Sequence, residues 1–344
     1  MARTDRLELL RRLEAHRGSR VICYVTSDRQ GATGKIASDA IPWIYSHLRS
    51  FESVSNIDLL VYSAGGVTMA GYRIAMLLSQ LCPKTFAVLV PYKAHSAATL
   101  MCLAADEIVM SAAGELSPID PSTQSPFNPA PQTGGGPTPV QVEDVASYFD
   151  LARQQSSHSE MLGQDEGPVD HDLRRVMVEK AFEGLVANVH PLALGSVNRA
   201  RRQIRMLARK LLGRAVKDGE AVDRIVDQVT KELYSHDYPI TRPEAVEMGL
   251  PVVRDETAEG IAWDIYLSFA GDLNLLKPYS PEEELGTSDQ AVVETELAVV
   301  ESTDAVDAFR TIKRIGRTSI LGPSGEQLSA YQEQVISQGW DRKE

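Results

Sequence analysis

Ser96 is the residue of this sequence that is best placed to act as a nucleophile. The apolar run 86–90 predicts a buried strand that ends at Pro91, and the small residues from Ala97 onward predict a helix. Ser96 therefore stands at a strand-to-helix corner, where free backbone N–H groups and the helix dipole favour a developing negative charge. Such a corner suits acyl transfer, because the N–H groups can hold an oxyanion. The alternative role for a lone serine at this place is a helix N-cap.

A second strand-to-helix corner precedes the first. The apolar run 57–62 predicts a buried strand, the segment 67–80 predicts a helix, and Gly65-Gly66 lies between them. Two glycines allow a backbone N–H group to approach a ligand closely, although an ordinary tight turn has the same composition. Taken together with the Ser96 corner, the glycine pair indicates an oxyanion hole.

The two corners resemble those of the superfamily that joins the Clp protease proteolytic subunit, signal peptide peptidase A and the crotonases. Within it, the chain resembles the serine dehydrogenase proteinase family, a signal-peptide-peptidase-like group, over residues 6–255 and more weakly over 297–313. The stretches that carry the likeness are Arg17-Gly18-Ser19-Arg20-Val21-Ile22, Ser63-Ala64-Gly65-Gly66, Val90-Pro91, Ala94-His95-Ser96, Thr99-Leu100, Ala104-Ala105-Asp106-Glu107-Ile108-Val109-Met110, Pro118-Ile119-Asp120-Pro121, His190-Pro191-Leu192-Ala193-Leu194-Gly195 and His236-Asp237-Tyr238-Pro239-Ile240.

The resemblance implies an α/β fold, the Clp protease/crotonase-like ββα spiral, with helical additions and a C-terminal extension. It also implies that Ser96 is the nucleophile, that Gly66 and Ala97 supply the oxyanion N–H groups, and that the protein is a homo-oligomer. The family usually has glycines directly after the nucleophile, whereas this chain has Ala97-Ala98. Alanine still supplies an N–H group, so the predicted oxyanion hole is kept.

A serine nucleophile needs a neighbouring group that takes its proton. The Clp subunit has a histidine where this chain has Asp120, and an aspartate of ordinary pKa, about 3.9, is a poor base at neutral pH. Signal peptide peptidase A has a lysine in a stretch that here contains none, between Lys93 and Lys180. The candidates for the base or a group that orients it are Lys180, His190, His236 and Asp120, with Lys93 and His95 as further candidates. For every candidate the alternative is a structural or solvated side chain.

The order of strands and helices predicts how these corners are held. Alternating strand and helix favours right-handed βαβ units around a parallel sheet. A segment rich in Pro, Ser, Thr and Gly predicts a mobile loop. We expect an N-terminal helix at 1–17, an α/β domain at 18–275 that contains the mobile loop 117–139 and a helical insert 142–235, and a C-terminal extension at 276–344 with a strand at 296–301 and a helix at 305–313.

A helix predicted over 196–217 is strongly basic and has no acidic residue before Asp218. Nucleic-acid binding is one interpretation. The 344-residue chain carries a net charge of −12, which argues against a protein that binds nucleic acid by its overall charge. Pairing with an acidic surface of the same subunit or of a neighbour is therefore favoured for this helix.

Other features restrict the class of protein. The three cysteines lie in apolar runs and are an odd number, which indicates reduced thiols and a cytoplasmic protein. We expect no signal peptide, because residues 1–15 are charged throughout, and no membrane span. The seven histidines show no metal-ligand spacing, and Gly65-Gly66 is not part of a phosphate-binding motif, so no metal and no cofactor are expected.

We therefore expect a serine endopeptidase of the signal-peptide-peptidase-like type, which cleaves peptides or unfolded chain through Ser96. Such substrates are expected to bind by strand addition beside the Gly65-Gly66 turn. Two alternatives stay open on the same fold. One is a catalytically inactive peptide-binding or scaffold homo-oligomer, and the other is an acyl-CoA enzyme, because a fold alone does not determine chemistry.

Overall fold

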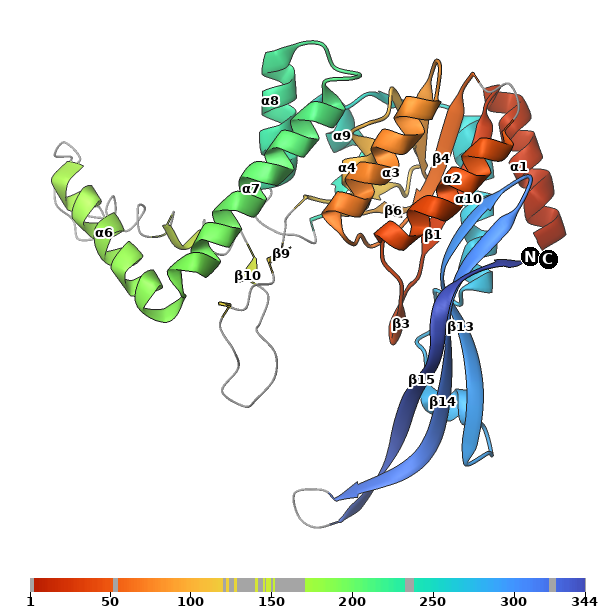
Figure 1. Cartoon of the computed structure of the whole chain (residues 1–344). Helices are drawn as coiled ribbons and strands as arrows, with labels where there is room; N and C mark the ends of the chain where they lie inside the picture. The colour runs from red at the N-terminus through yellow and green to blue at the C-terminus, as the bar shows by residue number, and fades with distance from the viewer. Residues whose placement is uncertain are drawn as a thin grey trace.

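A computed structural model describes residues 3–51, 55–119, 122–123, 127–128, 140–141, 145, 147–149, 151, 171–232, 238–321 and 326–343. Among these residues the main sheet has eight strands in the order β12-β7-β5-β4-β1-β13-β14-β15. The first five of these strands run parallel to one another, and β13, β14 and β15 are added in antiparallel pairs (Figure 1). The α/β class expected from the sequence is confirmed.

Helices cover both faces of the parallel part of the sheet. The strands β4 (Ile57–Tyr62) and β5 (Phe86–Val90) are buried along their whole length, which is why they are continuous apolar runs in the sequence. On one face the core is completed by α2 (Ile41–Ser50), α3 (Thr68–Leu81) and α4 (Ala97–Cys102). On the other face it is completed by α1 (Arg3–Arg17) and α10 (Glu256–Asp272).

The remaining short elements surround this core. The other strands of the parallel part are β1 (Arg20–Thr26), β7 (Glu107–Met110) and β12 (Val252–Val253). The small strands are β2 (Asp28–Arg29), β3 (Ala32–Thr33), β6 (Lys93–Ala94), β8 (Glu115–Leu116), β9 (Ser122–Thr123), β10 (Val140–Gln141) and β11 (Ile240–Thr241), and the short helices are η1 (Ser38–Ala40), α9 (Arg242–Met248) and α11 (Pro281–Leu285). The strands expected at 57–62 and 86–90 are confirmed.

The helical part of the chain extends away from the sheet. It consists of α6 (His171–Asn188), α7 (Pro191–Leu212) and α8 (Gly219–Asp227), followed by a π-helical turn at Gln228–Glu232, and α6 lies at the end of α7 that is remote from the sheet (Figure 1). The basic helix expected at 196–217 begins earlier, at Pro191, and ends at Leu212. Arg205 and Arg209 of α7 form ion pairs with Asp227 and Asp223, so part of its charge is neutralised within the same chain.

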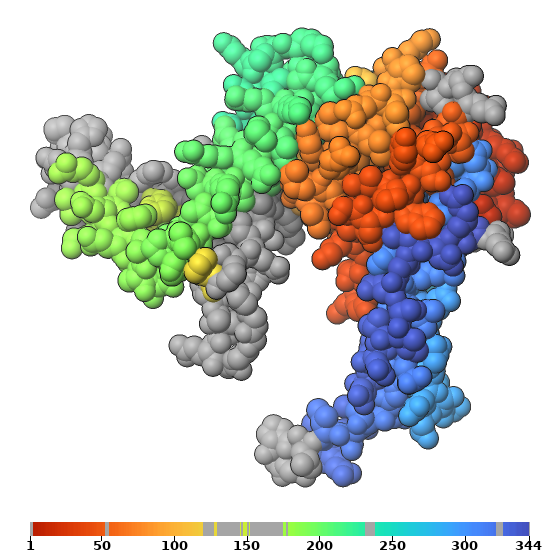
Figure 2. Space-filling model, in the orientation of Figure 1, coloured from red at the N-terminus to blue at the C-terminus, as the bar shows by residue number. Residues whose placement is uncertain are grey.

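The C-terminal residues form strands where the sequence pattern predicted one helix. The expected strand 296–301 is part of β13 (Gln290–Ser302), which pairs antiparallel with β1. The helix expected at 305–313 is wrong, because these residues belong to β14 (Val306–Leu321). β14 pairs along its length with β13 on one side and β15 (Gln327–Lys343) on the other. The outer parts of β14 and β15 project from the body of the molecule (Figure 2).

The expected domain boundaries stay predictions, although the extension 276–344 joins the main sheet through β13. Much of the expected loop 117–139 lies outside the described residues, as does part of the insert 142–235. Cys23, Cys82 and Cys102 are buried and unpaired. In the part of the chain that the structure describes, every helix is too short or too polar to cross a bilayer.

A buried Ser–His–Asp chain ties α2 to the C-terminal strands. His47 Nε2 lies 2.9 Å from Asp307 Oδ2, and His47 Nδ1 lies 2.8 Å from Ser302 Oγ. A neutral ring that donates through Nε2 to the carboxylate accepts the Ser302 hydroxyl at Nδ1. Arg342 binds both oxygens of Asp307 at 2.9 Å. The side chains of Ser302, His47 and Asp307 are buried, so we assign them a structural role in anchoring β13, β14 and β15.

Acidification is expected to weaken this anchor. Burial lowers the pKa of His47, and the neighbouring Asp307 opposes this shift without cancelling it. The stability that the neutral ring contributes is present above the unfolded-state pKa of about 6.5 and is lost as the pH falls toward the lower folded-state pKa. We expect the wild-type free energy of unfolding to fall more steeply with decreasing pH than that of His47→Gln, by at most about 1.4 kcal/mol per pH unit. Urea unfolding between pH 7.5 and 5 measures both slopes, and parallel slopes would contradict the expectation.

Candidate functional site

Ser96 has a backbone conformation that residues with a side chain rarely adopt. Its φ is 52° and its ψ is −108°, at the N-cap position of α4. A conformation of this kind costs free energy and persists only where the surrounding structure imposes it. The backbone N–H of Ser96 donates to Ser117 Oγ at 2.9 Å, and Leu100 N–H donates to the Ser96 carbonyl at 3.0 Å. The corner is therefore held from both sides of the nucleophile candidate.

Two buried hydroxyl groups support the corner and were not expected from the sequence. Thr99 Oγ1 lies 2.7 Å from the Ala94 carbonyl and accepts a bond from Ser117 N–H at 3.1 Å. Ser117 Oγ in turn accepts the Ser96 N–H. The sequence does carry a signal for Thr99, because a polar residue inside an apolar helix needs a buried partner. Ser117 was assigned to the start of the predicted mobile loop, and yet it is fully buried together with Ile119.

Gly65 lies directly against Ser96. A Cβ atom at Gly65 would stand 2.9 Å from Ser96 Cβ and 3.1 Å from the His95 carbonyl oxygen, and Gly65 has a φ of 109°. The two corners predicted from the sequence are thus in contact. Both the close approach and the positive φ restrict position 65 to glycine.

Ile36 orients the peptide groups around Gly66. Ile36 N–H donates to the Gly65 carbonyl at 2.9 Å, and Val67 N–H donates to the Ile36 carbonyl at 2.8 Å. The Gly65 carbonyl and the Gly66 N–H belong to the same planar trans peptide group, and in such a group they point in opposite directions. The Gly66 N–H therefore points away from Ile36, and within the described residues it has no acceptor.

The Ala97 N–H is the second donor of the expected oxyanion hole. Ala97 is the first residue of α4, where N–H groups have no partner within the helix. It has no acceptor among the residues that the structure describes. The Ser96 N–H is already used by Ser117, so the two donors expected for the oxyanion hole, Gly66 and Ala97, are the ones without an acceptor among these three N–H groups in the described part of the chain. Such an arrangement can stabilise an oxyanion formed on attack by Ser96.

Lys93 and His95 are held by acidic side chains. Lys93 Nζ lies 2.9 Å from Asp28 Oδ2, and the Tyr62 hydroxyl donates to the other oxygen of Asp28 at 2.7 Å. Burial lowers the pKa of Lys93, but the hydrogen bond to Asp28 and the nearby charges of Asp28, Tyr92 and Glu115 together outweigh this effect and raise the pKa overall. The ammonium group therefore keeps its proton near neutral pH. His95 Nε2 lies 3.1 Å from Glu115 Oε1.

The other base candidates do not approach Ser96 in this chain. Lys180 is exposed on α6, which lies at the remote end of α7 (Figure 1). His190 caps the beginning of α7, where its Nδ1 accepts the Leu192 N–H at 3.2 Å and its ring stacks on Phe127 at 4.7 Å. His236 and Asp120 lie outside the described residues. The structure thus brings the Gly65-Gly66 corner together with Ser96 and Ala97. Lys180 and His190 lie elsewhere, on α6 and at the beginning of α7.

Metal ligands do not gather near this site. In the described ranges, no three His, Cys, Asp or Glu side chains are grouped so that they could hold a metal ion. The chemistry that the arrangement offers is nucleophilic attack by a hydroxyl with N–H stabilisation of the oxyanion.

The sequence of this chain is similar to one described family and to two proteins of an archaeon. Residues 1–133 match the family described as ClpP-like SDH-type serine proteinase. An uncharacterised protein of Methanocaldococcus jannaschii is 27% identical over 255 residues, which cover 72% of this chain and 73% of that protein. A second uncharacterised protein of the same organism is 33% identical over 124 residues, which cover 34% of this chain and 41% of that protein.

Two solved structures show similarity at low sequence identity. A membrane-bound stomatin-specific protease is 14% identical, with 69% of this chain and 82% of that chain covered and a TM-score of 0.38. A probable enoyl-CoA hydratase/isomerase from Mycobacterium abscessus is 11% identical, with 73% and 71% covered and a TM-score of 0.34. Over residues 1–133, which include both corners of the site, the chain is similar to the ClpP-like SDH-type serine proteinases, in agreement with the resemblance that the sequence motifs carry.

Proposed function

We propose that this protein is a serine peptidase in which Ser96 attacks a peptide carbonyl. The observation that carries the proposal is the contact between Gly65 and Ser96, which brings together two corners whose N–H groups at Gly66 and Ala97 have no acceptor among the described residues. The Ser96 oxygen forms a bond to the carbonyl carbon, and the negative charge moves to the carbonyl oxygen. Collapse of this intermediate expels the amine and leaves an acyl-enzyme, which water hydrolyses.

The proton of Ser96 passes to a base and then to the leaving amine. Within one chain, we propose His236 or Asp120 for this role, because Lys180 and His190 lie on the remote part of α7 and α6. Lys180 or His190 becomes the base only if a second copy of the chain supplies it. A homo-oligomer is accordingly part of the proposal. The proposed substrate is of the signal-peptide-peptidase type and is presented as extended peptide or unfolded chain.

Three buried, unpaired cysteines favour a cytoplasmic location.

A peptide-binding homo-oligomer without catalysis is the second candidate function. It is favoured by the pairing of Lys93 with Asp28 and of His95 with Glu115, which occupies the two basic side chains nearest to Ser96 in the sequence. Without a base, the same corners would bind a peptide carbonyl but leave its bond intact.

The two candidates are separated by covalent labelling and by turnover. The full-length chain is incubated with a fluorophosphonate probe, and the labelled residue is identified by peptide mass mapping. Release of fragments from unfolded casein is followed in parallel. A peptidase labels at Ser96 and releases fragments that the probe suppresses. Binding of casein without labelling or fragments would establish the non-catalytic candidate instead.

Gly65→Ala is expected to slow labelling of Ser96 by about 100-fold. The added Cβ would stand 2.9 Å from Ser96 Cβ at a φ of 109°, so either the nucleophile or the oxyanion corner must move. A misplacement of about 1 Å at a reacting group costs about that factor. The rate of probe incorporation is measured beside that of Gly219→Ala, where an added Cβ meets no atom within 4 Å. Equal rates in the two variants, with both proteins folded by circular dichroism, would contradict the assigned contact.

A further inference from the structure

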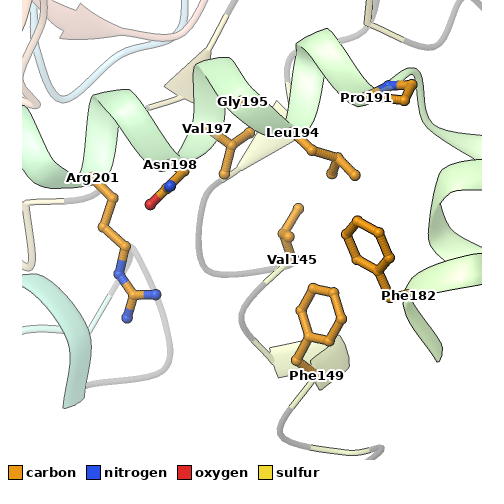
Figure 3. A pocket seen from close by; sticks show the side chains of 9 residues that line it. All are labelled: Val145, Phe149, Phe182, Pro191, Leu194, Gly195, Val197, Asn198 and Arg201. Carbon is orange, nitrogen blue, oxygen red and sulfur yellow. The ribbon is translucent and has the colours of Figure 1, made fainter. Parts of the chain in front are cut away.

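A cavity lies where α6 and α7 meet, and the residues that line it do not include those of the Ser96 corner. Its volume is about 420 Å³, which is within the range of sites for small ligands. It is bounded by the first half of α7, by Phe182 of α6, and by Val145 and Phe149. Figure 3 shows the side chains of Leu194, Val145, Phe149 and Phe182 facing one another, with Asn198 and Arg201 extending from α7 to one side of them.

One part of this α6–α7 cavity is apolar. The rings of Phe149 and Phe182 stack with centroids 6.2 Å apart and an interplanar angle of 27°. Leu194 and Val145 line the same space (Figure 3). Phe182 is 52% exposed although it is a large apolar side chain. An aromatic wall left open in this way is typical of a surface that binds an apolar group.

The other part of the cavity offers hydrogen-bond donors and a positive charge. Asn198 and Arg201 follow Leu194 at helical spacing, so the three share one face of α7. Arg201 is half-buried and forms no ion pair with any acidic side chain among the described residues. Arg205 and Arg209, farther along the same helix, do pair with aspartates of α8. Among the described residues, the guanidinium group at the cavity is thus left available for a ligand.

We propose that the α6–α7 cavity binds a carboxylate that is attached to an apolar group. The planar guanidinium of Arg201 matches a carboxylate in two parallel hydrogen bonds, with Asn198 as a further donor. The apolar group lies between Phe149, Phe182 and Leu194. The C-terminus of a peptide that ends in a large apolar residue has this chemistry, and a free fatty acid has it as well. This proposal does not rest on the proposed peptidase activity.

Binding is tested with a short fluorescent peptide that ends in Leu-Phe, prepared with a free carboxylate and as the C-terminal amide. Both are titrated into the full-length chain carrying Ser96→Ala, which prevents cleavage, and fluorescence anisotropy is recorded. We expect the carboxylate form to bind at least about tenfold more tightly than the amide, because the amide cannot form the charged pair. Decanoate is then added as a competitor. If it displaces the peptide, fatty acids are ligands of the cavity; if it does not, the ligand is a peptide C-terminus.

Matched variants separate the cavity from the general charge of α7. Arg201→Gln is expected to remove the preference for the carboxylate, whereas Arg202→Gln, an equal change at an exposed neighbour outside the cavity, keeps it. Phe182→Ala is expected to weaken both peptide forms by about tenfold. Equal affinity for the two peptide forms, equal losses in the two arginine variants, an unchanged affinity in Phe182→Ala, or the absence of binding would each overturn the proposal. Circular dichroism confirms that each variant is folded.

Discussion

Ser96→Ala is expected to abolish labelling by the fluorophosphonate probe and to lower the rate of casein cleavage by about 10³-fold or more. The loss is large because the hydroxyl oxygen forms the covalent bond to the substrate, so no other interaction replaces it. The N–H groups of Gly66 and Ala97, which have no acceptor in the described part of the chain, stay in place in this variant. We therefore expect binding of unfolded casein to be retained. The measurements are probe incorporation, fragment release and casein binding on the same preparation.

Two control variants show that the loss comes from the missing hydroxyl. Ser38→Ala changes an exposed serine on η1 and is expected to label at the wild-type rate. Ser96→Gly also lacks the hydroxyl, but glycine accepts a φ of 52° without strain, so we expect its free energy of unfolding to rise by about 1 kcal/mol. Undiminished labelling in Ser96→Ala would refute the assignment of the nucleophile, and a less stable Ser96→Gly would refute the strain.

Arg6→Met is expected to lower the free energy of unfolding by about 3 to 5 kcal/mol. The Arg6 side chain is 3% exposed and donates to Glu301 Oε2 through Nε at 2.8 Å. It also binds Asp272 at 2.5 Å and Ser268 at 2.9 Å, and its guanidinium lies 4.1 Å from the centre of the Phe269 ring. Removal of the guanidinium takes the close partner from the Glu301 carboxylate, which is 1% exposed, and leaves the more exposed Arg3 at 3.9 Å beside it. Burial of an unpaired charge carries this large cost.

The double variant Arg6→Met with Glu301→Leu serves as the control for this prediction. Replacement of a buried ion pair by apolar side chains of similar volume is close to neutral, so we expect the double variant to recover most of the lost stability. Urea unfolding followed by circular dichroism measures all three proteins. A single variant that loses less than about 1 kcal/mol would show that the pair between α1 and β13 does not hold these elements together.

The two corners could be predicted because their signals are local. The runs 57–62 and 86–90 are apolar throughout, since helices cover both faces of these strands. Parallel neighbours end at the same edge of a sheet, and β4 pairs with β5. The turns that follow them must therefore meet, which is why Gly65 and Ser96 could be expected to lie together.

The C-terminal strands could not be predicted from local spacing. Residues 305–313 contain apolar side chains at intervals that fit a helix as well as a strand. Their conformation is decided by backbone hydrogen bonds to β13 and β15, whose residues are distant in the sequence. Local propensity is weak compared with this pairing. The buried partners of His47 and Arg6 likewise lie more than 250 residues away.

The sequence by itself determined the α/β class, the strand-to-helix corners and the identity of the nucleophile candidate, because each depends on a short run of residues. The tertiary structure decided what surrounds Ser96. It showed that Ser117 and Thr99 hold the strained corner, and that acidic side chains hold Lys93 and His95. These outcomes depend on which side chains the fold brings within hydrogen-bond distance, and sequence spacing does not encode such distances.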